Sequence, residues 1–162
     1  MHKSSIRLIL SAALFFLFQG QASAVVVDCT TIQSVAVSHF VTHNNEYGGH
    51  LNAHVRGQTP PPGFSQNGRT LFRDTHDWEE AYAALANQVP ALQCNTDAAL
   101  GTEAARTLPW QFFSYQCTAA NINGVCTNGN EIQTNHVVYV LRVVPNGNGR
   151  RWIVFTAYPT PQ

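Results

Sequence analysis

Two histidines in a glycine-rich segment are the first candidates for chemistry. His50 and His54 lie four residues apart, and Arg56 follows two residues later. On a helix, residues at this spacing share a face. Because histidine titrates near neutral pH, the pair could perform acid–base catalysis or bind a metal ion, or it could be ordinary surface polarity. The metal interpretation lacks the glutamate of an H-E-x-x-H motif and an evident third ligand.

A second candidate group lies near the C-terminus. Thr156 and Tyr158 belong to an aromatic and β-branched run, and strand alternation predicts both on one face, beside Trp152 and Val154. Hydroxyls on a strand face can orient a phosphate oxygen. Threonine and tyrosine are also ordinary strand residues, so the pair by itself does not require a function.

The N-terminus is typical of a secretory signal over residues 1–24. A positive start precedes an apolar stretch over residues 8–18, and Ala22-Ser23-Ala24 forms an A-x-A cleavage site. Removing 24 of the 162 residues leaves 138, which we expect to form a single secreted or periplasmic domain without a membrane segment.

Charge limits the partners of this mature chain. The whole chain has 9 basic and 9 acidic residues, only 11% of its length, which excludes a coiled coil and a histone-like protein. Cleavage would remove Lys3 and Arg7, so the mature net charge is −2 and all seven remaining basic residues are arginines. A field that holds nucleic acid over the whole surface is absent, and an anion site must be local.

Four cysteines, all in the mature part, predict disulfides because export makes them permissible. Three pairings are possible in principle. Cys117 and Cys126 flank a loop rich in Asn and Gly, a spacing that suits two strand ends closed by a turn. We therefore expect Cys117–Cys126 and Cys29–Cys94. The absence of C-x-x-C argues against a zinc site.

Helical patterns occupy the first part of the mature chain. Apolar spacing predicts a helix over residues 30–42, capped by Thr30 or Thr31, and then a turn over residues 44–49. Three prolines make residues 57–68 a surface loop. Asp74 is the expected N-cap of the strongest helix, residues 74–88, and residues 96–106 are expected to form a short helix.

Strand patterns occupy the rest of the chain. Residues 110–117, 136–144 and 151–158 are the expected strands, and two Asn-Gly pairs in residues 145–149 predict a hairpin between the last two. Helices followed by an antiparallel sheet indicate an α+β fold.

Several short motifs occur in the order found in one bacterial family. They are Gly48-Gly49-His50, His54-Val55, Thr70-Leu-Phe-Arg-Asp74 and Thr156-Ala-Tyr158-Pro159. Over residues 47–159 the chain resembles the ribonuclease A-like domain of contact-dependent growth inhibition toxins and other polymorphic toxins. The resemblance implies helices packed on a V-shaped antiparallel sheet, cleavage of RNA without a metal or other cofactor, and a possible immunity protein as partner.

The resemblance also implies an active site. It contains His54 or His50, an arginine, and Thr156 and Tyr158; Arg69 is the first candidate for the arginine and Arg56 the second. These residues would cleave RNA by transphosphorylation to a 2′,3′-cyclic phosphate. A histidine acts as base or acid, the arginine binds the phosphorane, and Tyr158 replaces a second histidine as acid.

Three functions remain open from the sequence. The preferred one is a monomeric secreted ribonuclease, in which His136 is a weaker candidate for the acid. The second is a non-enzymatic secreted inhibitor or binding module, which the net charge of −2 and the lack of lysine favour slightly. The third is a histidine-based metal hydrolase. The sequence does not indicate the RNA target or base preference.

Overall fold

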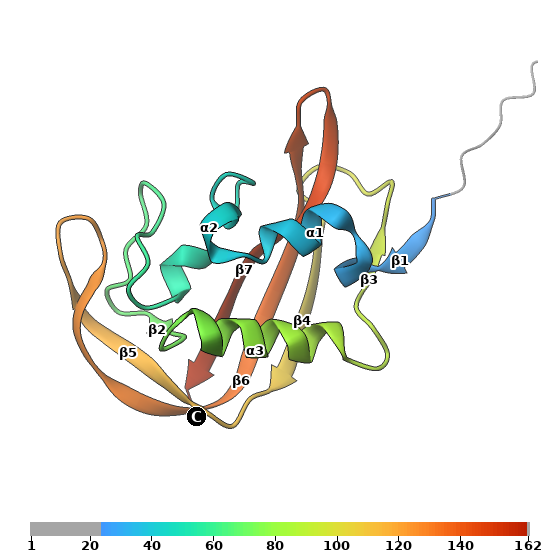
Figure 1. The fold of residues 1–162 in the computed structure, drawn as a ribbon. Coiled ribbons are helices and arrows are strands. Elements are labelled where there is room, and N and C mark those ends of the chain that lie inside the picture. Colours follow the sequence, from blue (N-terminus) through green and yellow to red (C-terminus); the bar gives the residue numbers. More distant parts are fainter. Residues whose placement is uncertain (1–23, 162) are drawn as a thin grey trace, which may run out of the picture.

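The computed structural model describes residues 24–161, so nearly all of the predicted signal sequence lies outside the described residues. It contains a two-stranded and a five-stranded antiparallel sheet, preceded and interrupted by short helices (Figure 1). This arrangement confirms the α+β class. The strands are β1 (Val26–Asp28), β2 (Thr70–Leu71), β3 (Gln93–Asn95), β4 (Glu103–Pro109), β5 (Phe113–Ala120), β6 (Cys126–Asn146) and β7 (Gly149–Pro161).

The five-stranded sheet has two arms because β6 is long. The beginning of β6 pairs with β5, whose other edge pairs with β2; these strands form the first arm. The rest of β6 pairs with β4 on one side and β7 on the other, which forms the second arm. Figure 1 shows the two arms diverging from the bend in β6, with the helical segments in the opening between them.

The N-terminal helical region is divided into short pieces. They are η1 (Cys29–Thr31), α1 (Gln33–Ser38), α2 (Val41–Asn44) and η2 (Leu51–His54). The continuous helix expected over residues 30–42 is wrong because Phe40 is extended, with φ −66° and ψ 123°, between α1 and α2. The expected cap is also wrong: the Asp28 side chain accepts a hydrogen bond from the Thr30 amide.

Helix α1 covers the outer edge of β7. The Ser34 hydroxyl donates to the Trp152 carbonyl at 2.6 Å, and the Ser38 hydroxyl accepts from the Val154 amide at 2.9 Å. An unpaired strand edge exposes backbone groups that can pair with another chain. The serines of α1 satisfy these groups at β7 and fix the helix against the strand.

Helix α3 (Thr75–Ala86) confirms the strongest helical prediction. The Asp74 carboxylate caps it by accepting from the Asp77 amide at 2.9 Å. Trp78, Ala81 and Leu85 are buried in the main core cluster. The hydroxyl of Tyr139 on β6 donates to the Ala81 carbonyl at 2.7 Å, which ties the helix to the sheet.

The short helix expected over residues 96–106 is wrong. Residues 103–109 form β4, which pairs with residues 136–142 of β6. Leu108 is buried and Ala104 packs against the core, whereas Glu103, Ala105 and Thr107 are exposed. This alternation allows one face of β4 to cover the core, so tertiary pairing outweighs the helical preference of the alanines.

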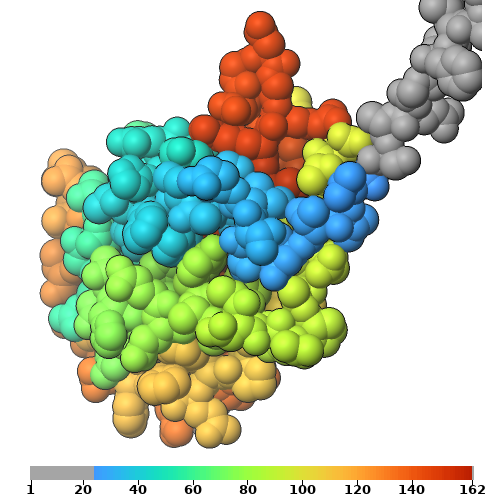
Figure 2. All heavy atoms as spheres, turned by 45° about the vertical axis from the view of Figure 1, so that its right-hand side comes forward, coloured from blue at the N-terminus to red at the C-terminus, as the bar shows by residue number. Residues whose placement is uncertain are grey.

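The three predicted strands exist with different ends. The first begins at Phe113 rather than at Trp110, which lies in the link between β4 and β5, while β6 and β7 are longer than expected. The β6–β7 hairpin turns within residues 145–149, as predicted. Its tip projects beyond the N-terminal segments, which lie over the middle of the molecule in the view of Figure 2.

Both expected disulfides are confirmed. Cys29–Cys94 joins the region of β1 to β3, and Cys117–Cys126 joins β5 to β6 beside their connecting loop. Cys29 and Cys94 belong to the main core cluster, whereas Cys117 and Cys126 belong to a smaller cluster in the first arm. Within residues 24–161, no helix has the length and apolar character needed to cross a membrane.

Candidate active site

The segment that carries His54 lies beside the strand that follows Arg69. The Phe72 amide donates to the His54 carbonyl at 2.8 Å, and the Arg56 amide donates to the Phe72 carbonyl at 3.0 Å. Val55 and Phe72 thus form a parallel β-bridge next to β2. This pairing draws the residue before β2, Arg69, toward His54, fifteen positions earlier in the chain.

His50 is positioned by a close approach of backbone to Asn44. The Asn44 side chain donates to the Ser38 and Val154 carbonyls, both at 2.7 Å, and accepts from the Leu51 amide at 2.8 Å. Gly49 is required here because an added Cβ would lie 2.3 Å from the Asn44 side-chain oxygen. The His50 amide then donates to the carbonyl of Phe155 at 2.9 Å, which attaches this segment to β7.

A β-bulge at Phe155 changes the faces of β7. Val154 pairs with Leu141 and Thr156 with Val140, so Phe155 has no pairing partner on β6. An inserted residue of this kind reverses the alternation of side chains beyond it. Ala157 therefore joins Val154 in the core. The prediction that Thr156 and Tyr158 share a face with Trp152 and Val154 is wrong, because the bulge turns Thr156 and Tyr158 to the opposite face.

The histidine, arginine and tyrosine candidates come together between the two arms of the sheet. His54 Nε2 lies 3.5 Å from Arg69 Nη1, at the limit of a hydrogen bond. The ring centroids of His54 and Tyr158 are 5.2 Å apart, and those of His50 and His54 are 6.0 Å apart. His50 does not share a helix with His54, because it is the residue that precedes η2.

The structure brings Arg69, not Arg56, to His54. Arg69 Nε donates to the Ser65 carbonyl at 2.5 Å, which leaves its terminal nitrogens directed toward the site. The guanidinium of Arg56 instead lies over the ring of Tyr115, 3.8 Å from its centroid. Of the two arginines that the sequence left open, only Arg69 has a described contact with a candidate histidine.

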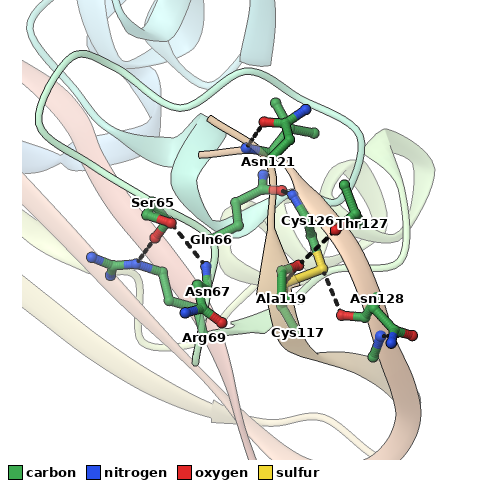
Figure 3. The surroundings of a disulfide bond; sticks show 12 residues. Ser65, Gln66, Asn67, Arg69, Cys117, Ala119, Asn121, Cys126, Thr127 and Asn128 are labelled. Carbon is green, nitrogen blue, oxygen red and sulfur yellow. Dashed lines mark hydrogen bonds between the residues drawn. A yellow bond between two sulfur atoms is a disulfide. The ribbon is translucent and has the colours of Figure 1, made fainter. Parts of the chain in front are cut away.

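Gln66 connects the site to the Cys117–Cys126 disulfide and was not recognised in the sequence. It is fully buried, and its Nε2 donates to the carbonyls of Asn52 and Val55, on either side of His54, at 2.9 and 2.7 Å. Its Oε1 accepts from the Cys126 amide at 2.9 Å (Figure 3). A glutamine in a polar, proline-rich loop carries no sequence signal for such a role.

Backbone hydrogen bonds attach Arg69 to the same disulfide. The Cys117 amide donates to the Arg69 carbonyl at 2.9 Å, and the Gly68 amide donates to the Cys117 carbonyl at 3.0 Å. The Gln66 amide also donates to the Gly124 carbonyl in the loop that joins β5 to β6. The disulfide of the first arm therefore supports both the arginine and the segment of His54.

Burial and nearby cations keep both histidines neutral. Burial, followed by the charge of Arg69 and by His50, lowers the pKa of His54 to about 3, although the nearby backbone of Thr70 acts in the opposite direction. Burial, followed by Arg69 and Arg142, lowers the pKa of His50 to about 4. Since Arg69 can only donate, His54 Nε2 faces it with a lone pair, and the proton of the neutral ring is assigned to Nδ1.

Three buried polar atoms at or beside the site have no hydrogen-bond partner among the described residues. They are His54 Nδ1, Thr156 Oγ1 and Asn52 Oδ1, and each belongs to a side chain at least nine-tenths buried. Buried polar atoms are usually paired, so each of these unpaired atoms is a group that a bound polar ligand can satisfy. Thr156 lies two residues before Tyr158 on β7 but has no described contact with His54.

His136 lies outside this group. It is exposed, pairs with Thr160 across the β6–β7 ladder, and its Nδ1 contacts the side-chain oxygen of Asn135 at 2.8 Å. In the part of the chain that the structure describes, no group of three or more His, Cys, Asp and Glu side chains could hold a metal ion.

The site thus combines a neutral imidazole, a guanidinium and hydroxyl groups in a largely buried setting. The imidazole can accept a proton, the guanidinium can bind a phosphate or carboxylate, and the hydroxyls can donate hydrogen bonds. Such a set suits acid–base chemistry on an anionic substrate. No family model matches the chain, and neither the curated proteins nor the solved structures contain a match to it.

Proposed function

We propose that the chain is a metal-independent endoribonuclease that cleaves RNA by transphosphorylation. The observation that carries the proposal is the meeting of three distant segments at His54, with Arg69 Nη1 3.5 Å from its Nε2 and the Tyr158 ring 5.2 Å from its ring. The two-armed antiparallel sheet with helices between its arms supports the resemblance to ribonuclease A-like domains.

The first chemical step is proton removal from a ribose hydroxyl. When the Arg69 guanidinium binds the phosphate, the lone pair of His54 Nε2 becomes free to accept the proton of the 2′-OH. The 2′-oxygen then forms a bond to the adjacent phosphorus. Arg69 donates hydrogen bonds to the phosphorane oxygens and offsets their added negative charge. Thr156 Oγ1, buried and unpaired among the described residues, supplies a further donor.

The second step breaks the chain. The bond between phosphorus and the 5′-oxygen breaks, and the leaving oxygen takes a proton from Tyr158, which leaves a 2′,3′-cyclic phosphate and a 5′-hydroxyl. DNA is not a substrate because it lacks the 2′-OH nucleophile. A tyrosine is needed as acid because His50 and His54, with pKa values of about 4 and about 3, are not in the acidic imidazolium form near neutral pH.

Substrate binding strengthens His54 as a base. The positive charge of Arg69 is one of the causes that lower the pKa of His54 in the free protein. A bound phosphate diester places a negative charge beside both groups and favours the protonated imidazole. The pKa of His54 therefore rises when the substrate binds. This rise makes His54 a better acceptor for the proton of the 2′-OH.

The test is digestion of a single-stranded RNA by the purified mature chain, with and without EDTA. We expect cleavage in both conditions and fragments that end in a 2′,3′-cyclic phosphate, identified by mass spectrometry. His54→Ala should reduce the rate by about 10²–10⁴-fold, the usual contribution of a general base or acid. His43→Ala is the matched control, because His43 is exposed at the end of α2.

Each outcome separates the candidate functions. Loss of activity in EDTA, with recovery on adding Zn²⁺, would point to the histidine-based metal hydrolase. Equal activity of wild type and His54→Ala would overturn the assignment of His54. No cleavage of any RNA by the folded wild-type protein would overturn the enzymatic proposal.

A non-enzymatic secreted binding or inhibitor module is the second candidate. The low pKa values of both histidines and the mature net charge of −2 favour it, because neither feature draws RNA to the protein. A binder built on the same residues would show no RNA loss that depends on His54. It would instead retain a partner whose binding is weakened by Arg69→Gln.

Export and use as a toxin are part of the proposal. Two disulfides support an oxidising compartment outside the cytoplasm. Expression with the native N-terminus should yield a secreted or periplasmic product that begins at Val25. If the product is toxic inside the producing cell, co-expression of a candidate immunity protein should restore growth.

A further inference from the structure

Arg142 lies beside the histidines on the other side from Arg69. It extends from β6, opposite Ile153 on β7, and its guanidinium carbon is 3.5 Å from the centroid of the Phe155 ring. Phe155 is the bulged residue of β7, and its ring meets the His50 ring edge to face at 4.6 Å. The bulge therefore holds an arginine against the histidine pair.

Aromatic contacts continue on the far side of His50. The Phe64 ring stacks on His50 at 4.7 Å with an interplanar angle of 17°. The guanidinium carbon of Arg69 is 5.9 Å from the centroid of Phe64. Arg69, Phe64, His50, Phe155 and Arg142 thus form an uninterrupted row, which we name the arginine–aromatic row. Its two ends are guanidinium groups.

The charge of Arg142 is available to a ligand. Its side chain is 35% exposed, and its Nε and Nη2 both contact one oxygen of Glu103. Its Nη1 has no protein partner within residues 24–161. A phosphate competes well for such a group because a guanidinium binds phosphate oxygens through a planar pair of donors.

We propose that Arg142 forms a second phosphate-binding subsite, which takes another phosphodiester of the RNA strand that Arg69 and His54 hold. The subsite rests on the proposed function, since it extends the same RNA chain along the row. Between the two arginines, Phe64 is 38% exposed, so part of its ring can contact an unpaired base. The row suits a polynucleotide better than an acidic peptide, because it combines guanidinium groups, which bind phosphates, with aromatic rings, which stack on bases.

Glu103 limits the strength of this subsite. Its carboxylate occupies two donors of Arg142 and would repel an approaching phosphate. Both side chains are partly exposed, so their ion pair contributes little to stability. Replacing Glu103 with glutamine should therefore strengthen phosphate binding at Arg142 without unfolding the protein, whereas replacing Arg142 should weaken it.

The test uses thymidine oligonucleotides, which bind but have no 2′-OH and so cannot be cleaved by the proposed reaction. Titration calorimetry compares the dinucleotide, which has a single phosphodiester, with the tetranucleotide, which offers further phosphodiesters to Arg142. We expect Arg142→Gln to weaken tetranucleotide binding by about tenfold, the value of one charge-assisted contact, and to leave dinucleotide binding unchanged. Glu103→Gln should strengthen tetranucleotide binding.

The matched control is Arg106→Gln. Arg106 pairs with Tyr139 on the neighbouring strand, so its side chain lies on the opposite face of the sheet from Arg142. Both substitutions remove one positive charge. A plot of the logarithm of the binding constant against the logarithm of the salt concentration gives a slope that counts the phosphates bound. Only Arg142→Gln should reduce the magnitude of this slope, by about 0.7 for one phosphate on a single strand.

The binding titrations and the RNA cleavage assay distinguish an error in the proposed subsite from an error in the proposed function. If Arg142→Gln and Arg106→Gln weaken tetranucleotide binding equally, or if neither does, the subsite is wrong even when RNA is cleaved. If Arg142→Gln alone weakens it but the wild type cleaves no RNA, the subsite holds and the enzymatic proposal fails. Equal affinity of the wild type for both oligonucleotides would also overturn the subsite.

Discussion

Stacked guanidinium groups are the main feature of this protein at the scale of single residues. Among residues 24–161, four arginines lie over aromatic rings: Arg56 over Tyr115, Arg69 over Phe64, Arg142 over Phe155 and Arg151 over Tyr47. A planar guanidinium stacks on a ring and still offers donors at its edge, which a lysine ammonium does not. The exclusive use of arginine in residues 25–162 fits this arrangement and concentrates positive charge locally.

Substitution of Arg69 and substitution of Arg56 should have very different effects on the rate of RNA cleavage. Arg69→Gln should reduce RNA cleavage by about 10²-fold or more, because it removes the group that stabilises charge on the phosphorane. Arg56→Gln should leave the rate within about twofold of wild type, since Arg56 stacks on Tyr115 instead of contacting a histidine. The measurement is the cleavage rate of each variant and of the wild type on the same RNA substrate. A larger loss in Arg56→Gln would reverse the assignment.

The low histidine pKa values predict unusual acid tolerance of the reaction. The base form of His54 persists until the pH falls to its pKa of about 3, and that of His50 until about 4. The acidic limb of kcat/KM, which reports the free enzyme, should therefore lie near pH 3–4 instead of near 6.5. Steady-state rates from pH 3.5 to 7.5, with folding checked by circular dichroism, provide the measurement.

An independent check follows the imidazole signals by NMR. In Arg69→Gln the pKa of His54 should move upward, toward 6.5, because a positive neighbour is removed. An acidic limb near pH 6.5, with His54 titrating there in the wild type, would contradict the burial of a neutral base at this site.

At the scale of secondary-structure elements, the site depends on irregularities. The bulge in β7 turns Thr156 and Tyr158 away from the core, and the short helix η2 ends at His54. Gln66 then joins the backbone around His54 to the Cys117–Cys126 hairpin. The two disulfides consequently lie in different surroundings, one beside the candidate site and one in the main core.

Removing each disulfide should separate stability from activity. The chain-entropy model gives about 4 kcal/mol for Cys29–Cys94, which spans 65 residues, and about 3 kcal/mol for Cys117–Cys126, which spans 9. The double variant Cys29→Ser/Cys94→Ser should lose more unfolding free energy. Cys117→Ser/Cys126→Ser should lose more activity per folded molecule, because Gln66 and Arg69 bond to that hairpin.

Urea unfolding measures the unfolding free energy of each variant. RNA cleavage, at a temperature where both variants are folded, measures the activity per folded molecule. The comparison uses each disulfide variant as the control for the other. Equal activity of the two folded variants would show that the hairpin disulfide does not position Arg69 or His54.

At the scale of the whole molecule, buried neutral histidines couple stability to pH. The pKa of His54 is lowered to about 3 in the folded protein, whereas an unfolded chain titrates near 6.5. Between these values the unfolded chain binds a proton that the folded protein does not. The free energy of unfolding therefore has its full contribution from His54 above pH 6.5 and falls as the pH drops below it.

This fall should be measurable between pH 6.5 and 5. His54 contributes a slope of up to about 1.4 kcal/mol per pH unit, and the half-exposed His50 contributes less. His54→Gln should flatten the dependence, whereas His43→Gln should keep the wild-type slope. Urea unfolding at several pH values gives the slopes, and identical slopes in wild type and His54→Gln would be the contrary result.

Interactions between neighbouring residues were sufficient to predict several local features of this protein from its sequence. Asp74 begins a helix because its carboxylate caps free amides, and the Asn-Gly turn signals around residue 147 close the last hairpin. The cysteine spacing around an Asn- and Gly-rich loop predicted the pairing that the structure has. The histidines, Arg56 and the terminal hydroxyls were candidates from their residue types and spacing, and Arg69 was a candidate from the resemblance.

The meeting of these groups depends on contacts between distant segments. The choice between Arg69 and Arg56 depends on the bridge between Val55 and Phe72, which brings Arg69 to His54. The face on which Thr156 lies depends on the residue inserted into β7. Residues 103–109 became a strand because β6 offered an edge to pair with. The sequence alone determined the side chains, caps and turns, since these depend on neighbours in the chain. Only the tertiary structure decided which charges and hydroxyls surround His54, because register, bulges and burial depend on partners far away in sequence.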